Sequence, residues 1–197
     1  MVALVRMIDK EHHVPHFNIV ALSAAINCKK EDTMLALNNV ELCSTLPKER
    51  LPEIAEMLWK HLWGQSYTHP FVLDMASKAT YLLCAVEGSV MKGKIVGCAL
   101  TTRYRGFPDN YVDNRAVFGG WCIRPENRGA GIGGKLYDGC MQWERANGER
   151  AIFATTDSEE ARQILHGRQK PWQNQWCFVR EGVNEDRTRM KLWRLEL

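Results

Sequence analysis

The sequence lacks a strong excess of charge of either sign. Its 26 Lys and Arg residues are nearly balanced by 23 Asp and Glu residues, which leaves a formal net charge of +3 over 197 residues. Proteins that bind the phosphates of nucleic acids usually carry a dense basic surplus, so this composition argues against nucleic acid as a partner. A small acidic ligand remains compatible with the composition.

Long apolar runs are also missing. No run approaches the ~20 residues that a membrane span requires. The apolar stretch at 19–26 is short, and Asp9 and Glu11 precede it, which is atypical of a secretory signal. We therefore expect no membrane partner and a cytoplasmic location.

The sequence has no CxxC pair, although it contains seven cysteines. An odd number of cysteines, most of them inside apolar runs, indicates reduced core thiols rather than disulfides. His12, His13 and His16 have no cysteine or carboxylate nearby at a spacing typical of metal ligands. We predict no metal site.

Regular patterning begins only after the first 36 residues. Residues 1–36 show no sustained period of 2 or 3.6 and are interpreted as an N-terminal extension, whereas 37–197 form one domain of typical size. Strands are predicted at 39–44, 81–86, 95–102, 116–123, 151–156, 176–180 and 188–197, and helices at 51–62, at 132–146 and from 157 through 165. This alternation indicates an α/β fold.

A glycine-rich turn between a predicted strand and a predicted helix is the most informative stretch. Residues 123–136 read Ile-Arg-Pro-Glu-Asn-Arg-Gly-Ala-Gly-Ile-Gly-Gly-Lys-Leu. Glycines at a helix entrance leave free backbone N–H groups and the positive end of the helix dipole aimed at one point. The turn therefore predicts an anion site, most naturally for a pyrophosphate.

Two phosphate-binding motifs fit this turn incompletely. Residues 129–135 match the P-loop spacing, but Leu136 stands where Ser or Thr should hold Mg²⁺. The dinucleotide pattern G-x-G-x-x-G is met by Gly129, Gly131 and Gly134, with Asp157 near the distance of its ribose-binding acid. Five residues including a proline separate the strand from the first glycine, and only 40 residues follow Asp157. A dinucleotide-binding protein stays a weak alternative.

The third pattern, R-x-x-G-x-G, is met by Arg128, Gly131 and Gly133. Residues 123–133 resemble motif A of the GNAT superfamily of acyl-CoA-dependent N-acetyltransferases, and the order of predicted elements over about 39–197 is similar to that family. The resemblance implies a mixed, mostly antiparallel central sheet that is flanked by helices and has splayed central strands.

The resemblance also implies an activity and a binding site. A GNAT enzyme transfers an acetyl group from acetyl-CoA to a primary amine of a small molecule or protein by direct attack. Pantetheine would pair with the backbone of Trp121, Cys122 and Ile123, while the pyrophosphate would bind Arg128, Gly129, Ala130, Gly131, Ile132, Gly133 and Gly134. Ser158 stands where the family commonly has an asparagine near the cofactor. Cys122 itself is interpreted as a small core side chain.

The catalytic residues depart from the family pattern. No carboxylate lies on the strand at 116–123, so Asp113 is the nearest candidate base, although a solvated loop aspartate is the simpler interpretation. Leu165 replaces the tyrosine that often protonates the departing thiolate. His166 is adjacent to it and is a weak candidate acid, with a surface histidine as the alternative. These departures leave a non-catalytic acyl-CoA-binding module as the rival hypothesis.

The acceptor is not determined by the sequence. Six aromatic residues could wall an acceptor groove, but core packing is favoured at such spacings: Trp59, Trp63, Tyr67, Tyr104, Phe107 and Tyr111. Asp109 and Asp113 would suit a cationic amine such as a polyamine, an aminoglycoside or a protein N-terminus. The sequence is also compatible with a homodimer.

Overall fold

The described part of the chain forms one seven-stranded sheet with the strand order β1-β2-β3-β4-β5-β7-β6. The computed structural model describes residues 39–63, 68–104, 114–156, 176–183 and 189–197. The strands are β1 (Val40–Cys43), β2 (Tyr81–Glu87), β3 (Lys94–Tyr104), β4 (Arg115–Ile123), β5 (Ala151–Thr156), β6 (Cys177–Val183) and β7 (Arg189–Glu196). Among the described strands, only β4 and β5 pair in parallel.

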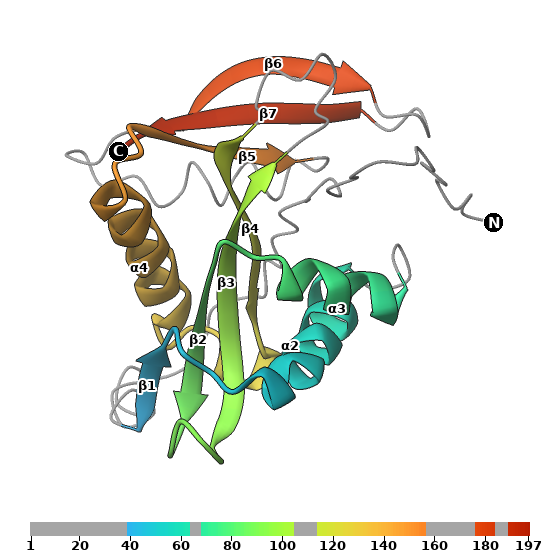
Figure 1. Ribbon diagram of the computed structural model, residues 1–197, viewed down its shortest axis with the longest axis vertical. Coiled ribbons are helices and arrows are strands. Elements are labelled where there is room, and N and C mark those ends of the chain that lie inside the picture. The colour runs from blue at the N-terminus through green and yellow to red at the C-terminus, as the bar shows by residue number, and fades with distance from the viewer. Residues whose placement is uncertain (1–38, 64–67, 105–113, 157–175, 184–188) are drawn as a thin grey trace.

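Helices cover both faces of the sheet. The helix α4 (Ile132–Ala146) lies on one face, while α2 (Leu51–Leu58) and α3 (His69–Ser77) lie on the other (Figure 1). A π-helical turn, η2 (Trp59–Trp63), continues α2, and short 3₁₀ turns occur at η1 (Lys48–Arg50) and η4 (Pro125–Asn127). In the figure β2, β3 and β4 run nearly vertically, whereas β5, β7 and β6 run across the view.

Alternating side chains of the strands build two cores, one on each face. On the α2 face, Cys98, Leu100 and Val117 pack with Ile54 and Leu58. The core on the α4 face includes Ala99, Phe118, Ile152, Leu136 and Cys140. The strands are therefore apolar on both sides, as expected for a sheet that is covered twice.

The predicted mixed α/β fold with a mostly antiparallel sheet is confirmed. The helix at 132–146 and the strand at 151–156 have the predicted bounds, and the other described strands differ only at their ends. The helix predicted at 51–62 is an α-helix only to Leu58. The N-terminal extension at 1–36 and the helix expected over 157–165 lie outside the described residues.

The helix α3 was not among the elements predicted from the sequence. Pro70 occupies its first turn, where a proline fits, and Val72, Met75 and Ala76 form its buried side. This apolar stripe spans little more than one turn, so its periodicity is a weak signal.

The cysteines only partly follow the prediction of core thiols. Cys84, Cys98, Cys122 and Cys140 are buried, but Cys177 is exposed. All six cysteines in the described part of the chain are free thiols. The described residues contain no cluster of three or more metal-ligating side chains and no helix long and apolar enough to cross a membrane.

Candidate functional site

The strand β4 contains a bulge in its middle. Leu100 of β3 is opposite Gly119, whereas Cys98 is opposite Cys122, so β4 carries one extra residue between these two pairs. Gly120 lies in this bulge with φ +55°, and a Cβ there would approach the Leu100 side chain to 2.7 Å. A bulge increases the local twist of its strand, which turns the second half of β4 away from a regular ladder.

The strands β4 and β5 meet at one point and then diverge. Val117 and Phe153 are the residues in register between them, and both lie early in their strands. Beyond this pair, the described residues of β4 from Gly119 to Ile123 have no registered partner on β5. The edge of β4 toward β5 beyond this pair is therefore the candidate path for a ligand that would pair with backbone groups.

The glycine-rich turn begins after η4 and ends at α4. Gly129 has φ +83° and Gly131 has φ +75°, and a Cβ added at either would meet no atom within 4 Å. Gly131 caps α4, and its carbonyl accepts from Gly134 and Lys135. The amides from Gly129 to Gly133 donate to no backbone acceptor among the described residues. These five amides lie at the N-terminus of α4, with open space beside Gly129 and Gly131, which makes the turn a suitable cradle for a phosphate group.

Hydrogen bonds fix this turn to the strands below it. Arg128 Nε donates to the Ile123 carbonyl at 3.2 Å, and Arg124 Nε donates to the Ile95 carbonyl at 2.6 Å. The indole Nε1 of Trp121 donates to the Gly133 carbonyl at 3.1 Å. The turn is therefore held in place before a ligand arrives.

Not every residue predicted for the turn can offer its side chain. Ala130 and Ile132 are 7% and 2% exposed, and both pack in the core under α4. At these two positions only the backbone is available to a ligand. All the residues predicted to bind the pyrophosphate lie in this turn. The group that they all can offer to a ligand is the backbone amide.

Two residues of η2, Lys60 and His61, lie near the glycine-rich turn, and the sequence did not indicate them as site residues. The pKa of His61 is lowered by partial burial and then by the positive charges of Arg124, Lys60 and Arg128. These three cationic groups, Lys60, Arg124 and Arg128, come from η2 and from the glycine-rich turn. No local motif marks Lys60 and His61, because only packing of η2 against β4 brings them here.

Glu126 is the acidic residue beside this cationic group. Its carboxylate accepts from Lys94 Nζ at 2.8 Å, and this hydrogen bond, more than any other cause, lowers the pKa of Glu126 to about 2. The carboxylate stays ionised and is paired with Lys94, and its charge also acts on Arg124 and on His61. The positive charges of Lys60, Arg124, Arg128 and Lys94 outnumber it. The surface near the turn therefore favours an anion.

Cys122 faces the opposite side of β4 from Trp121. Its thiol is buried against α2, where Sγ lies 3.9 Å from the Met57 carbonyl, and burial raises its pKa to about 12. A thiol with this pKa is not a nucleophile near neutral pH. The core interpretation of this side chain is confirmed.

The candidate catalytic residues Asp113 and His166 lie outside the described residues, as does Ser158. Of the six aromatic residues considered for an acceptor groove, Trp59 has a described side chain. It is 36% exposed and meets the ring of His69 edge-on at 6.2 Å, so it is not a core residue.

A model of the acetyltransferase (GNAT) family matches residues 47–168. No curated protein matches the chain.

Several solved structures share the fold at low identity. The candidate acetyltransferase yncA of Salmonella typhimurium, solved with its cofactor acetyl-CoA, is 18% identical, with 81% of this chain and 94% of that one covered and a TM-score of 0.57. An N-acetyltransferase of Staphylococcus aureus Mu50 is 16% identical, with coverage of 80% and 98% and a TM-score of 0.57. A chain in the structure of the NatC complex bound to Gag peptide and CoA is 15% identical, with coverage of 81% and 99% and a TM-score of 0.57. At these identities the likeness establishes the fold alone.

Proposed function

The chain belongs to the acetyltransferase (GNAT) family, and on this basis we propose that it transfers an acetyl group from acetyl-CoA to a primary amine. The attack is direct, with no acyl-enzyme intermediate. The buried Cys122 thiol supports this route, because its raised pKa leaves no thiolate near the gap to accept the acetyl group.

The observation that carries the proposal is the run of amides from Gly129 to Gly133, which donate to no backbone acceptor among the described residues, beside the point where β4 and β5 diverge. A pyrophosphate on the amides of Gly129 to Gly133 places the rest of a CoA molecule at the gap between β4 and β5. The residues present fit CoA better than a Mg²⁺-nucleotide, because Leu136 is fully buried and offers no hydroxyl for the metal.

Each part of the site has a separate task in this proposal. The backbone of Trp121 to Ile123 pairs with the pantetheine arm, which fixes the thioester along β4. A backbone N–H near Cys122 polarises the thioester carbonyl and stabilises the oxyanion of the tetrahedral intermediate. Holding the amine and the thioester carbon together supplies a large part of the rate.

The amine acceptor is proposed only as a class. A cationic polyamine, an aminoglycoside and a protein N-terminus each present the primary amine that this reaction requires. Asp113 is retained as the proposed base that removes a proton from the amine, with His166 as a weaker candidate acid and Ser158 as a cofactor contact. A second copy of the chain as partner also remains a proposal.

Binding and turnover test the function in two steps. Isothermal titration with CoA measures the site, and release of free thiol from acetyl-CoA with spermidine, kanamycin or a peptide with a free N-terminus measures transfer. CoA binding without turnover on any amine favours the non-catalytic acyl-CoA-binding module. The replacement of the family tyrosine by Leu165 is the observation that supports this alternative. NADH binding in the absence of CoA binding favours the dinucleotide alternative.

Gly131→Val tests the pyrophosphate site itself. A β-branched side chain strains the backbone at φ +75° and covers the free amides, so we expect CoA to bind at least about 100-fold more weakly, the loss of two hydrogen bonds to a charged group. Gly148→Val is the matched control, because Gly148 has φ +86° and open surroundings just after the far end of α4. Equal CoA affinity in both variants would contradict the assignment.

A further inference from the structure

The strand β3 also contains a bulge, at its beginning. Val86 of β2 is opposite Ile95, whereas Ala85 is opposite Gly97, so Val96 is an extra residue of β3 between these two pairs. A bulge disrupts the ladder locally and turns backbone groups of its strand in new directions. The carbonyls of Ile95 and Val96 both bond to the segment that follows β4.

Arg124, the first residue after β4, fastens the glycine-rich turn to this β3 bulge. Its backbone N–H donates to the Val96 carbonyl at 2.9 Å, and its Nε donates to the Ile95 carbonyl at 2.6 Å. Its two Nη groups have no hydrogen-bond acceptor among the described residues. Because a guanidinium is planar and rigid, the bond at Nε sets the direction in which the Nη groups point.

Glu53 of α2 holds the same residue of the β3 bulge. Its Oε1 accepts from the Ile95 N–H at 3.2 Å, while its Oε2 accepts from Arg50 Nη2 at 2.7 Å and from Arg50 Nε at 3.2 Å. Ile95 is fully buried, and charged side chains bind both its N–H and its carbonyl. A shift of Ile95 would therefore move the acceptor that orients Arg124.

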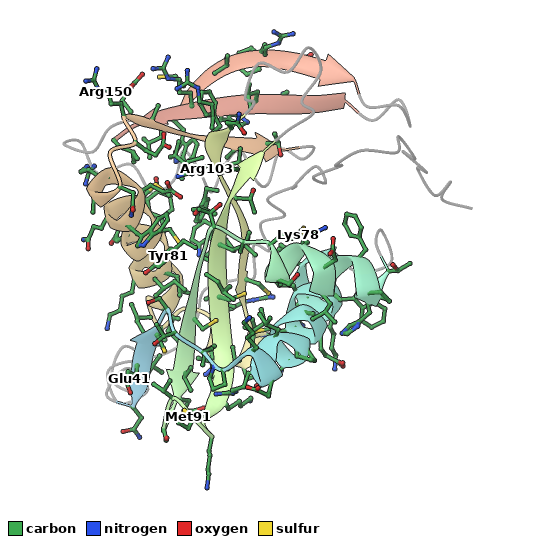
Figure 2. All side chains as sticks on the ribbon, viewed as in Figure 1. Glu41, Lys78, Tyr81, Met91, Arg103 and Arg150 are labelled. Atoms are coloured by element: carbon green, nitrogen blue, oxygen red, sulfur yellow. The ribbon has the colours of Figure 1, made fainter. Side chains whose placement is uncertain are left out.

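Arg50 keeps the Glu53 carboxylate in place. Arg50 also donates to the carbonyls of Val90 at 2.7 Å and Gly93 at 2.6 Å, in the hairpin between β2 and β3 that carries Met91 in Figure 2. Its side chain is 12% exposed, and its guanidinium is bound at three nitrogens, so the carboxylate has a fixed, charge-assisted partner. The contacts thus run from Arg50 through Glu53 and Ile95 to the cationic residues of the site.

We propose that Glu53 is a positioning residue for CoA, which holds Ile95 so that Arg124 directs its Nη groups at the pyrophosphate. This inference rests on the proposed function, because the ligand is CoA. Glu53 does not touch the ligand. A carboxylate here strengthens the binding of an anion, which is opposite in sign to the direct effect of its negative charge.

Glu53→Gln tests this sign. The amide loses the charge-assisted bonds with Arg50 and no longer holds Ile95 firmly, so we expect the Kd for CoA to rise about fivefold, the upper range for a partly exposed ion pair. Removal of a negative charge with no change in position would lower the Kd instead. In an Arg124→Met background the same substitution should leave the Kd unchanged, because the residue through which Glu53 acts is gone.

His61 reports the position of Arg124 without any ligand. The charge of Arg124 contributes to the lowered pKa of His61. Displacement of Arg124 in Glu53→Gln should therefore raise the pKa of His61 toward its ordinary value, whereas loss of a negative charge alone would lower it further. Proton NMR of the imidazole ring against pH measures this pKa, with the resonance assigned by His61→Gln.

Glu56→Gln is the matched control. Glu56 is an exposed acid of the same helix, so its substitution removes the same charge from α2 without changing the hold on Ile95. We expect it to leave the Kd for CoA and the pKa of His61 unchanged. Urea denaturation of each variant establishes that the fold is intact.

The outcomes separate the two proposals. An unchanged or lower Kd for CoA in Glu53→Gln, or a fivefold loss that persists in the Arg124→Met background, would overturn the positioning role and leave the proposed function standing. Absence of CoA binding to the wild type would overturn the proposed function, and the CoA positioning role with it. With an accepted amine, Glu53→Gln should raise KM for acetyl-CoA about fivefold and leave kcat nearly unchanged.

Discussion

Glycines with positive φ serve two different purposes in this protein. Gly120 is packed against Leu100, so the absence of a side chain permits a close approach inside the bulge. Gly131 has open surroundings, so the absence of a side chain leaves its neighbouring amides accessible. The same residue type thus shapes a strand at one position and a binding surface at the other.

Glu144 is a fully buried carboxylate that holds the end of β3 against α4. It accepts from the Thr101 hydroxyl and from Arg103 Nη1, the latter at 3.1 Å, while Arg103 also pairs with Glu149 at 3.3 Å. Arg103 lies where β3 approaches α4 and the end of the sheet in Figure 2. The charge of Glu144 is thereby matched within the fold.

Glu144→Gln tests this network. The variant keeps a hydrogen-bond acceptor for Thr101 but leaves Arg103 with one carboxylate fewer. We therefore expect the free energy of unfolding to fall by about 2 kcal/mol. This loss is smaller than for a fully buried ion pair, because Arg103 is 30% exposed. Asp74→Asn breaks the exposed pair with Lys78 and should cost below about 0.5 kcal/mol. Equal losses in urea denaturation would contradict a special role for Glu144.

At the scale of elements, the strand β4 connects all parts of the site. Its bulge turns it away from β5, its edge faces the gap, and its end leads into the glycine-rich turn. The Trp121 indole ties β4 to the first turn of α4 through the Gly133 carbonyl. A change in the bulge should therefore affect both stability and ligand binding.

Gly120→Ala tests the bulge. The added Cβ would lie 2.7 Å from the Leu100 side chain at a φ of +55°, so we expect about 2 kcal/mol of destabilisation from overpacking and backbone strain. Gly148→Ala has a similar backbone conformation with nothing within 4 Å and should cost about 1 kcal/mol. Thermal denaturation of the two variants measures the difference, and a Gly148→Ala loss as large as that of Gly120→Ala would contradict the packing argument.

At the scale of the whole molecule, the sheet has two halves, β1-β2-β3-β4 and β5-β7-β6, which meet through the pairing of β4 with β5. The gap where these two strands diverge is the candidate site. Cationic groups from η2 and from the glycine-rich turn lie at its wide end, while the overall net charge is only +3. The attraction for an anion is therefore local. It should weaken with salt to the extent that these groups are exposed.

The lowered pKa of His61 predicts how the affinity for CoA depends on pH. Burial and the charges of Arg124, Lys60 and Arg128 lower its pKa from 6.5 in the free protein, and a bound polyanion raises it again. Binding therefore takes up a proton, and affinity should increase as the pH falls from 8 through the region below 6.5, by a few-fold for partly screened charges.

Titration with dephospho-CoA measures this effect, because that ligand lacks a phosphomonoester that itself titrates near pH 6. Calorimetry in buffers of different ionisation enthalpy counts the protons taken up. His61→Gln should remove the pH dependence. The same proton uptake in wild type and variant would show that another group is responsible.

The sequence by itself determined the features that depend on neighbouring residues. Alternation and helical periodicity identified most described strands and the helix α4, and the glycines of 129–134 predicted the candidate anion site, because backbone conformation is a local property. The short helix α3 was missed because its apolar stripe is too brief to stand out.

Only the tertiary structure decided which distant residues meet. The bulge of β4 depends on its register with β3, the approach of His61 to the glycine-rich turn depends on how η2 packs, and the hydrogen bond from Ile95 to Glu53 joins residues that are 42 positions apart. Pairing and packing of this kind arise from long-range contacts, and a shift of one residue in register reverses which face a side chain occupies. The candidate anion site could therefore be proposed from local sequence, whereas the arrangement of the strands and side chains around it required the fold.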